Sequence, residues 1–264
     1  MYEFNYHKAS SVADAAARLA AAADAKLMAG GQTLIAALKL RLASPSDVID
    51  LRGVAELRGI RKDGGAISIG ALTTHAEVAA SKDVLQAVPA LASLAASIGD
   101  PMVRNLGTLG GSIANNDPAA DYPAGVLALG ATVHTNKRKV AAADFFTGMY
   151  ETALQPGEII TSVSFPLPKR AGYAKFKNPA SRYAIVGVFV AETANGVRVA
   201  VTGAGPCVFR VPELEKALGS RFSADAVANI KVAAAGLNSD MHASAEYRAH
   251  LVTVMAKRAV EAAS

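Results

Sequence analysis

The sequence predicts a mixed α+β protein with two domains, and three features indicate this. The first fifty residues alternate strand, helix, strand, helix and strand, which is typical of a compact α/β unit. Segment 166–172 carries prolines and charges and is the best candidate for a linker. Beyond it, two apolar strands meet at Asn195-Gly196, a strong hairpin signal, and three amphipathic helices follow. The second part therefore reads as an antiparallel sheet backed by helices.

Local signals place the elements of the opening unit. Ser10 or Ser11 can cap the first helix, and Asp14 completes a pattern similar to a capping box. Pro45 lies beyond the second helix and stops it. Strands are expected at 2–7, 26–29 and 48–51, and helices at 12–23 and 34–42.

A second unit starts near Gly53. Asp63-Gly64-Gly65 predicts a hairpin, and Thr74 can cap a helix. Strands are expected at 60, 66–69, 131–135, 140–142 and 158–166, and helices at 75–80, 88–98 and 122–129. Beyond the linker we expect strands at 173–178, 184–193 and 197–203, and helices at 211–219, 223–236 and 244–262.

Two glycine segments carry most of the functional information. The first spans 28–35 with Gly30-Gly31, and the second spans 105–117 with Gly110-Gly111. A Gly-Gly pair lacks both Cβ atoms, so the backbone can adopt positive φ and approach a ligand closely. Consecutive N–H groups in such a turn can converge on a phosphate. Two such segments, about eighty residues apart, suggest a clamp on a long ligand that carries a diphosphate.

Each glycine pair taken alone also fits a plain chain reversal. Neither segment matches the GxGxxG dinucleotide fingerprint or the GxxxxGK[ST] phosphate loop, so the sequence supports neither a Rossmann nor a P-loop protein.

Composition excludes several classes of protein. The 264 residues, 52% of them hydrophobic, can build sizeable cores, yet no apolar stretch reaches the length of a membrane span. A single cysteine, Cys207, excludes an internal disulfide and an iron–sulfur cluster held by this chain. The five histidines show no metal-ligand spacing, so we expect them to be surface or hydrogen-bonded residues. The formal charge of +5 is scattered, which argues against nucleic-acid binding, and the two basic runs at 137–139 and 169–170 read as solvated turns. No secretory signal is visible, and we expect a cytoplasmic protein.

Ala29–Leu34 and Arg104–Ser112 closely resemble the paired flavin loops of the FAD-binding medium subunit of molybdenum hydroxylases. That family includes aerobic carbon monoxide dehydrogenase and xanthine dehydrogenase. The resemblance runs nearly end to end, and also includes Ile69–Thr74 and Pro156–Ile160. It implies a vanillyl-alcohol-oxidase-type FAD-binding domain at 1–167, with subdomains at about 1–52 and 53–167. It further implies a carbon monoxide dehydrogenase flavoprotein C-terminal domain at 172–264.

The resemblance implies that this chain binds FAD, and without a covalent bond, because neither glycine segment contains a histidine or cysteine to tether the ring. Backbone N–H groups of 29–34 and 108–112, with the hydroxyls of Thr33 and Thr108, would hold the diphosphate. Asp121 would bind the ribose at the adenosine end, unless it only caps the following helix. No catalytic residue or metal ligand is implied on this chain. The implied cofactor-binding residues are Ala29, Gly30, Gly31, Gln32, Thr33, Leu34, Gly107, Thr108, Leu109, Gly110, Gly111, Ser112, Asp121, Ile160, Lys177 and Tyr183.

The isoalloxazine end is less regular. Ile160 matches an apolar residue near the ring, and Lys177 matches a lysine whose charge would stabilise the reduced flavin. Tyr183 either lies against the ring or is an aromatic residue that starts a buried strand. Two positions depart from the family pattern: Ser112 replaces the common asparagine, and Arg182 replaces a frequent aspartate.

The resemblance also implies partner chains. A large subunit would carry molybdopterin and a small subunit would carry two [2Fe–2S] clusters, in a dimer of heterotrimers. This chain would then have the role of electron transfer. Two alternatives stay open: a stand-alone flavin oxidase of the same superfamily and a non-enzymatic nucleotide-binding assembly module. The sequence names neither the substrate nor the electron acceptor.

Overall fold

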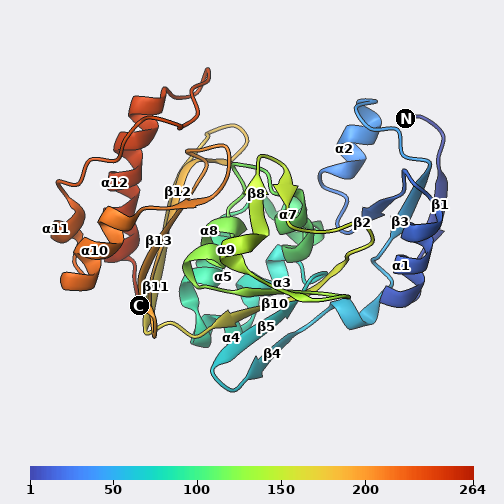
Figure 1. The fold of residues 1–264 in the computed structure, drawn as a ribbon, viewed down its shortest axis with the longest axis horizontal. Coiled ribbons are helices and arrows are strands. Elements are labelled where there is room, and N and C mark those ends of the chain that lie inside the picture. The colour runs from blue at the N-terminus through green and yellow to red at the C-terminus, as the bar shows by residue number, and fades with distance from the viewer.

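A computed structural model describes residues 1–264. Three main sheets with their helices lie in a row, with the N-terminal sheet at one end and the C-terminal helices at the other (Figure 1). A fourth sheet of two short strands, 146–148 and 151–152, belongs to the central part. The mixed helix-and-sheet content predicted from the sequence is confirmed. None of the helices combines the length and apolar composition needed to cross a bilayer.

The N-terminal sheet has three parallel strands in the order β1-β3-β2. Ser11 caps the first helix by accepting a hydrogen bond from the N–H of Asp14, as predicted. Ile49 on the central strand is fully buried. The elements are β1 (Asn5–Lys8), α1 (Val12–Ala21), β2 (Lys26–Met28), α2 (Leu34–Lys39) and β3 (Asp47–Asp50).

The central sheet has five antiparallel strands in the order β4-β5-β10-β6-β7. The Gly64-Gly65 hairpin and the capping box of Thr74 with Glu77 form as predicted. Its elements are η1 (Ala55–Leu57), β4 (Ile60–Asp63), β5 (Ala66–Gly70), α3 (His75–Ala80), α4 (Lys82–Ala87), α5 (Pro89–Ala96), α6 (Pro101–Leu106), α7 (Leu109–Asn115), α8 (Tyr122–Ala128), β6 (Thr132–Thr135), β7 (Lys139–Ala141), α9 (Ala142–Phe145), β8 (Phe146–Gly148), β9 (Glu151–Thr152) and β10 (Ile160–Pro166).

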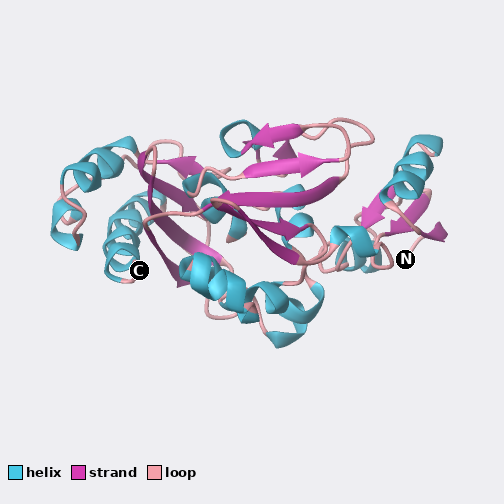
Figure 2. Cartoon of the chain, turned by 90° about the horizontal axis from the view of Figure 1, so that it is seen from below, coloured by secondary structure: helices cyan, strands magenta, loops and turns pink.

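The C-terminal sheet has four antiparallel strands between two layers of helices. Helices lie on both sides of this sheet (Figure 2). Helix α12 contacts β11 and β12, while α5 contacts β11 and α8 contacts β12 and β13. Its elements are β11 (Arg170–Lys177), β12 (Ala184–Thr193), β13 (Gly196–Thr202), β14 (Phe209–Arg210), α10 (Pro212–Ser220), α11 (Ala224–Val227) and α12 (Ala245–Glu261).

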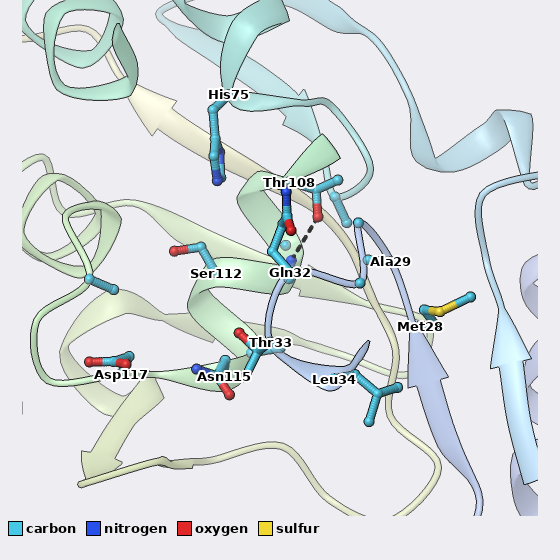
Figure 3. Close-up of a pocket in the computed structure, with 18 of the residues that line it drawn as sticks. Met28, Ala29, Gln32, Thr33, Leu34, His75, Thr108, Ser112, Asn115 and Asp117 are labelled. Carbon is cyan, nitrogen blue, oxygen red and sulfur yellow. Dashed lines mark hydrogen bonds between the residues drawn. The ribbon is translucent and has the colours of Figure 1, made fainter. Parts of the chain in front are cut away.

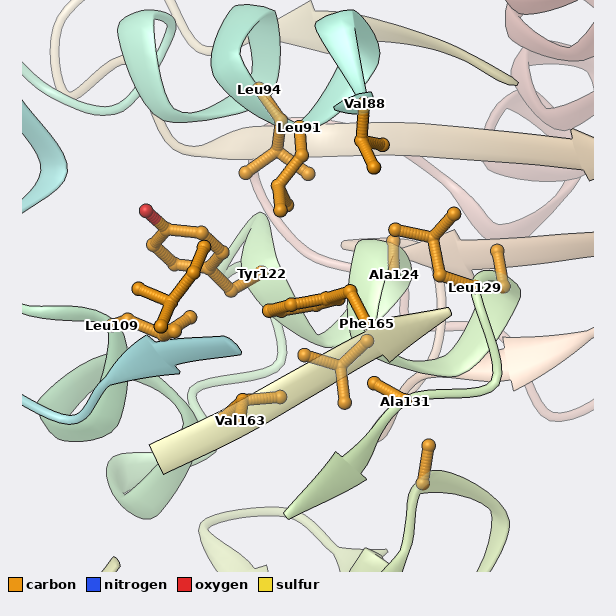
Figure 4. Close-up of a cluster of buried hydrophobic side chains, with 14 of the residues drawn as sticks. Val88, Leu91, Leu94, Leu109, Tyr122, Ala124, Leu129, Ala131, Val163 and Phe165 are labelled. Carbon is orange, nitrogen blue, oxygen red and sulfur yellow. The ribbon is translucent and has the colours of Figure 1, made fainter. Parts of the chain in front are cut away.

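One hydrophobic core joins the central and C-terminal sheets. A cluster of 32 buried residues contains Leu91, Tyr122 and Phe165 of the central part together with Tyr173 and Phe189 of β11 and β12. Figure 4 shows α5 and α8 facing β10 across this core. The two predicted domains therefore share apolar packing.

The prediction of a helix over 223–236 is wrong, because the helix ends at Val227. The next residues include Asn229, Ile230 and Val232, which favour helix weakly. Ile230 and Val232 pack against the core under α12, and the carbonyl of Ile230 accepts a hydrogen bond from Thr253. Tertiary packing holds this segment in an irregular conformation.

Two further expectations need correction. The turn between β12 and β13 is Ala194-Asn195, one residue earlier than predicted, and Gly196 opens β13 with φ of +99°. The basic runs are not plain solvated turns: Arg138 pairs with the buried carboxylate of Glu158, and Arg170 pairs with Glu192.

Candidate functional site

A cleft of about 600 Å³ separates the β2–α2 connection of the N-terminal sheet from α7 of the central part. Both glycine segments line it, although they lie far apart in the sequence (Figure 3). The cleft also contacts α3, β10 and the connection between β11 and β12. Of the predicted site residues, it is lined by Ala29, Gly30, Gly31, Gln32, Thr33, Leu34, Gly107, Thr108, Gly110, Gly111, Ser112, Asp121, Ile160 and Tyr183.

The first segment offers a run of free backbone donors. None of the six N–H groups of residues 29–34 donates a hydrogen bond within the chain. The turn that exposes them depends on Gly31, whose φ of +74° lies in the region that favours glycine. Gly30 is needed for a different reason, because a Cβ there would collide with the carbonyl of Leu106. Such a run of N–H groups can hold an anionic diphosphate.

The second segment is built differently from what the sequence suggested. Gly110 and Gly111 lie in the first turn of α7 and do not have positive φ. Gly110 allows close packing, since a Cβ there would come within 2.6 Å of the Cβ of Ala71.

Most N–H groups of this second segment already have acceptors. Those of Leu109 and Gly110 donate to the carbonyls of Thr73 and Ala71, and that of Gly111 donates to the hydroxyl oxygen of Thr108 at 3.1 Å. The N–H of Ser112 donates to the carbonyl of Thr108, so only the N–H of Thr108 has no acceptor within the chain among residues 108–112. The expected donation from all five N–H groups is therefore not met, although the hydroxyl proton of Thr108 is free to donate.

Asp121 lies at the wall of the cleft, and its carboxylate is buried. Its side chain does not cap α8. It accepts hydrogen bonds from the hydroxyl of Tyr173 and from Nζ of Lys175 at 2.9–3.0 Å. Burial raises the pKa of Asp121, while Lys175 and Tyr173 oppose that rise. This contact connects the cleft to the C-terminal sheet.

Two predicted residues do not line the cleft. The side chain of Leu109 is fully buried in the core. Lys177 is exposed at the end of β11, where the pairing with β12 shifts register between Phe176 and Lys177. That irregularity breaks the alternation that would place Lys177 on the same face as Lys175. Lys175 is the lysine that reaches a residue of the cleft.

Apolar side chains and the β11–β12 connection of the C-terminal part also line the cleft. The apolar lining includes Leu154, Ile159 and Ile160, and Tyr183 lines the cleft with about half of its surface exposed. Arg182 has φ of +64° and donates from Nη1 to the carbonyl of Gly99 at 3.1 Å. Arg182, which stands where the family frequently has aspartate, therefore joins the β11–β12 connection to the central part.

His75 is a lining residue that sequence reasoning missed. It is 5% exposed, its Nδ1 has no hydrogen-bond partner, and burial together with Arg104 lowers its pKa to about 4. This differs from the expectation of surface or hydrogen-bonded histidines. One signal for this residue is present in the sequence: His75 directly follows the predicted cap Thr74, so it begins a helix.

These features fit a flavin dinucleotide. The free N–H run of 29–34 can hold a diphosphate, and the apolar lining that includes Ile160 can accept a ring system. Residues 2–168 match the family described as the FAD binding domain in molybdopterin dehydrogenase, and residues 171–263 match the CO dehydrogenase flavoprotein C-terminal domain. The chain belongs to this family of FAD-binding oxidoreductase subunits.

Several characterised proteins are similar over nearly the whole chain. The carbon monoxide dehydrogenase medium chain of Afipia carboxidovorans is 36% identical over 98% of this chain and 96% of the relative. The nicotine 6-hydroxylase medium subunit of Paenarthrobacter nicotinovorans is 37% identical over 97% and 95%. A crystal structure of the Cu,Mo-CO dehydrogenase superposes with a TM-score of 0.90 at 36% identity, covering 99% of this chain and 98% of that chain. The resemblance predicted from the glycine segments is confirmed.

Proposed function

We propose that the chain is the FAD-carrying electron-transfer subunit of a heteromeric molybdenum hydroxylase. It would receive electrons from [2Fe–2S] clusters of a small partner subunit and pass them to an external acceptor, while a large molybdopterin subunit performs the substrate chemistry. The observation that carries this proposal is the run of six unpaired N–H groups at 29–34, set across a cleft from α7 in a chain of this family.

The cleft residues would divide the cofactor between them. The N–H groups of 29–34, together with the N–H and hydroxyl of Thr108, would bind the diphosphate. Asp121 would accept from ribose hydroxyls, because Tyr173 and Lys175 leave some of its roughly four lone-pair sites unused. Ile160 and Tyr183 would flank the ring. FAD supplies one- and two-electron redox chemistry, which suits a junction between clusters and an acceptor.

The finer architecture is part of the same proposal. We assign a vanillyl-alcohol-oxidase-type FAD domain to 1–167 and a C-terminal domain to 172–264, in a cytoplasmic dimer of heterotrimers. The matched family ranges and the three-sheet arrangement support this division.

The electron path can be tested on the assembled complex. Removing FAD should leave reduction of the clusters by substrate intact and block transfer to the external acceptor. Stopped-flow absorbance of FAD-depleted complex measures both steps. If the clusters fail to bleach on adding substrate, the flavin is not the exit station and the proposal is wrong.

Two further measurements on the chain itself distinguish the alternatives. The isolated chain, reconstituted with FAD, should oxidise no organic substrate of the complex, whereas a stand-alone oxidase would do so. A chain purified from its complex without a flavin absorption band would instead favour an assembly module.

A further inference from the structure

His75 stands out among the cleft residues because its imidazole is buried without a partner. The residue opens α3, and only 5% of its surface is exposed. Its Nδ1 is enclosed and accepts or donates no hydrogen bond. Figure 3 shows the ring directed from α3 into the cleft that Thr108 and Ser112 also line. Nε2 makes no hydrogen bond within the chain and is not enclosed as Nδ1 is, so it is the ring nitrogen that can bind a partner from the cleft.

The packing around the ring is specific. Its Nε2 lies so close to Gly107 that a Cβ there would come within 2.6 Å. The ring of Tyr122 packs against the imidazole, with 5.3 Å between centroids, and the Tyr122 hydroxyl is also buried without a partner. These neighbours hold the imidazole in one place. A plain apolar side chain would fill the same space without leaving a nitrogen unpaired.

The neighbourhood of His75 also identifies the chemistry that the ring faces. Gly107 precedes Thr108, whose N–H and hydroxyl proton are both free to donate. On the far side of Gly107 stands Gly30, whose Cβ would come within 3.0 Å of the Gly107 Cα. His75 therefore borders the same stretch of cleft as the donors of the first glycine segment. That stretch suits an anionic oxygen, not an apolar ring.

We infer that His75 is a cofactor-binding residue that donates a hydrogen bond from its imidazole to an oxygen of the dinucleotide's diphosphate. The inference rests on the proposed flavin site. In the flavin-free chain, burial and the charge of Arg104 lower the pKa of His75 to about 4, so the ring is neutral before the anion binds. A neutral imidazole carries one N–H donor, and the enclosed Nδ1 leaves Nε2 as the nitrogen nearer the cleft.

The test compares His75→Phe with the wild-type chain after acid removal of flavin. Two probes are titrated: FAD, and ADP, which has the diphosphate but no isoalloxazine. We expect His75→Phe to lower the affinities for FAD and for ADP by the same factor, on the order of tenfold or more, because a hydrogen bond to a charged group is lost. His134→Phe is the matched control, because His134 lies on β6 and does not line the cleft, and it should bind both probes normally.

Unchanged ADP affinity in His75→Phe would overturn the inference, because the ring would then not touch the diphosphate. A second measurement covers the case in which the variant fails to fold. In the wild-type chain labelled with ¹⁵N-histidine, ADP should shift the His75 ring signals and leave those of His134 in place, and an unmoved His75 signal also overturns the inference. If the wild-type chain binds neither FAD nor ADP, the proposed function fails instead.

Discussion

The carbonyl oxygen of Leu106 occupies the space that a Cβ on Gly30 would need. This contact brings the β2–α2 connection against the end of α6, so the first glycine segment is seated on the central part of the molecule.

Gly30→Ala should destabilise the chain and widen the cleft, because the added methyl group meets rigid backbone. Overpacking of this kind costs about 1–3 kcal/mol. Urea denaturation of the flavin-free chain measures the change. Gly65→Ala is the matched control, since a Cβ at Gly65 meets nothing within 4 Å and its φ is not positive. Equal stability of the two variants would show that the Leu106 contact yields without cost.

Gly31→Val and Gly111→Val should each abolish FAD binding. At Gly31 the branched side chain would be forced to φ of +74° and would meet Ile35, at a strain of about 1–3 kcal/mol. At Gly111 a Cβ would lie 2.9 Å from the hydroxyl oxygen of Thr108 and disturb the cap of α7. The ratio of flavin to protein absorbance is measured, with circular dichroism to confirm folding. Full flavin content in both folded variants would mean that the glycine segments are structural turns only.

FAD should be bound without a covalent link. No histidine or cysteine lies within either glycine segment, and Cys207 does not line the cleft. Acid precipitation of the purified chain should release the yellow colour into the supernatant. Colour that stays with the denatured pellet would contradict this prediction.

Lys175→Met should destabilise the protein strongly. Asp121 and Lys175 are both buried, at 4% and 5% side-chain exposure, so the substitution leaves a buried carboxylate without its cation. Removing one partner of a buried pair costs about 3–5 kcal/mol. The double variant Lys175→Met/Asp121→Asn should recover much of that loss in urea denaturation. A single variant as stable as wild type would show that the pair contributes nothing.

His75 should make folding less stable in mild acid. Its pKa is about 4 in the folded chain, against an ordinary value of 6.5. Above pH 6.5 both states are neutral and the residue has no effect. As the pH falls below 6.5 the unfolded chain takes up the proton first, so stability declines down to about pH 4, by about 3 kcal/mol in total.

The His75→Phe variant cannot take up this proton. Between pH 6.5 and pH 4, the unfolding free energy of the flavin-free wild type should therefore fall relative to that of flavin-free His75→Phe. A difference that stays constant from pH 7 to pH 4 would contradict the depressed pKa.

Sequence reasoning succeeded where the determinants are local. The capping box at Thr74, the hairpin at Gly64-Gly65 and the cap at Ser11 each depend on a few consecutive residues, and all three form. The two glycine segments were also found, and they line one cleft.

Sequence reasoning failed where contacts with residues far away in the sequence determine the structure. The N–H groups at the start of α7 find their acceptors at Ala71 and Thr73, which no local pattern reveals. Lys177, which the resemblance placed near the flavin ring, is exposed after the register shift at Phe176 and does not line the cleft. The burial of His75 depends on its contact with Tyr122, nearly fifty residues away in the sequence.

The core shared by the central and C-terminal sheets determines how this protein unfolds. Tyr173 and Phe189 belong to the segment beyond the linker, yet they are packed in the same cluster as Leu91 and Phe165. Cutting the chain at the linker would expose apolar surface on both fragments at once. The two family segments are therefore separate in sequence but form one cooperative unit, which should melt in a single calorimetric transition and withstand proteolysis as a whole.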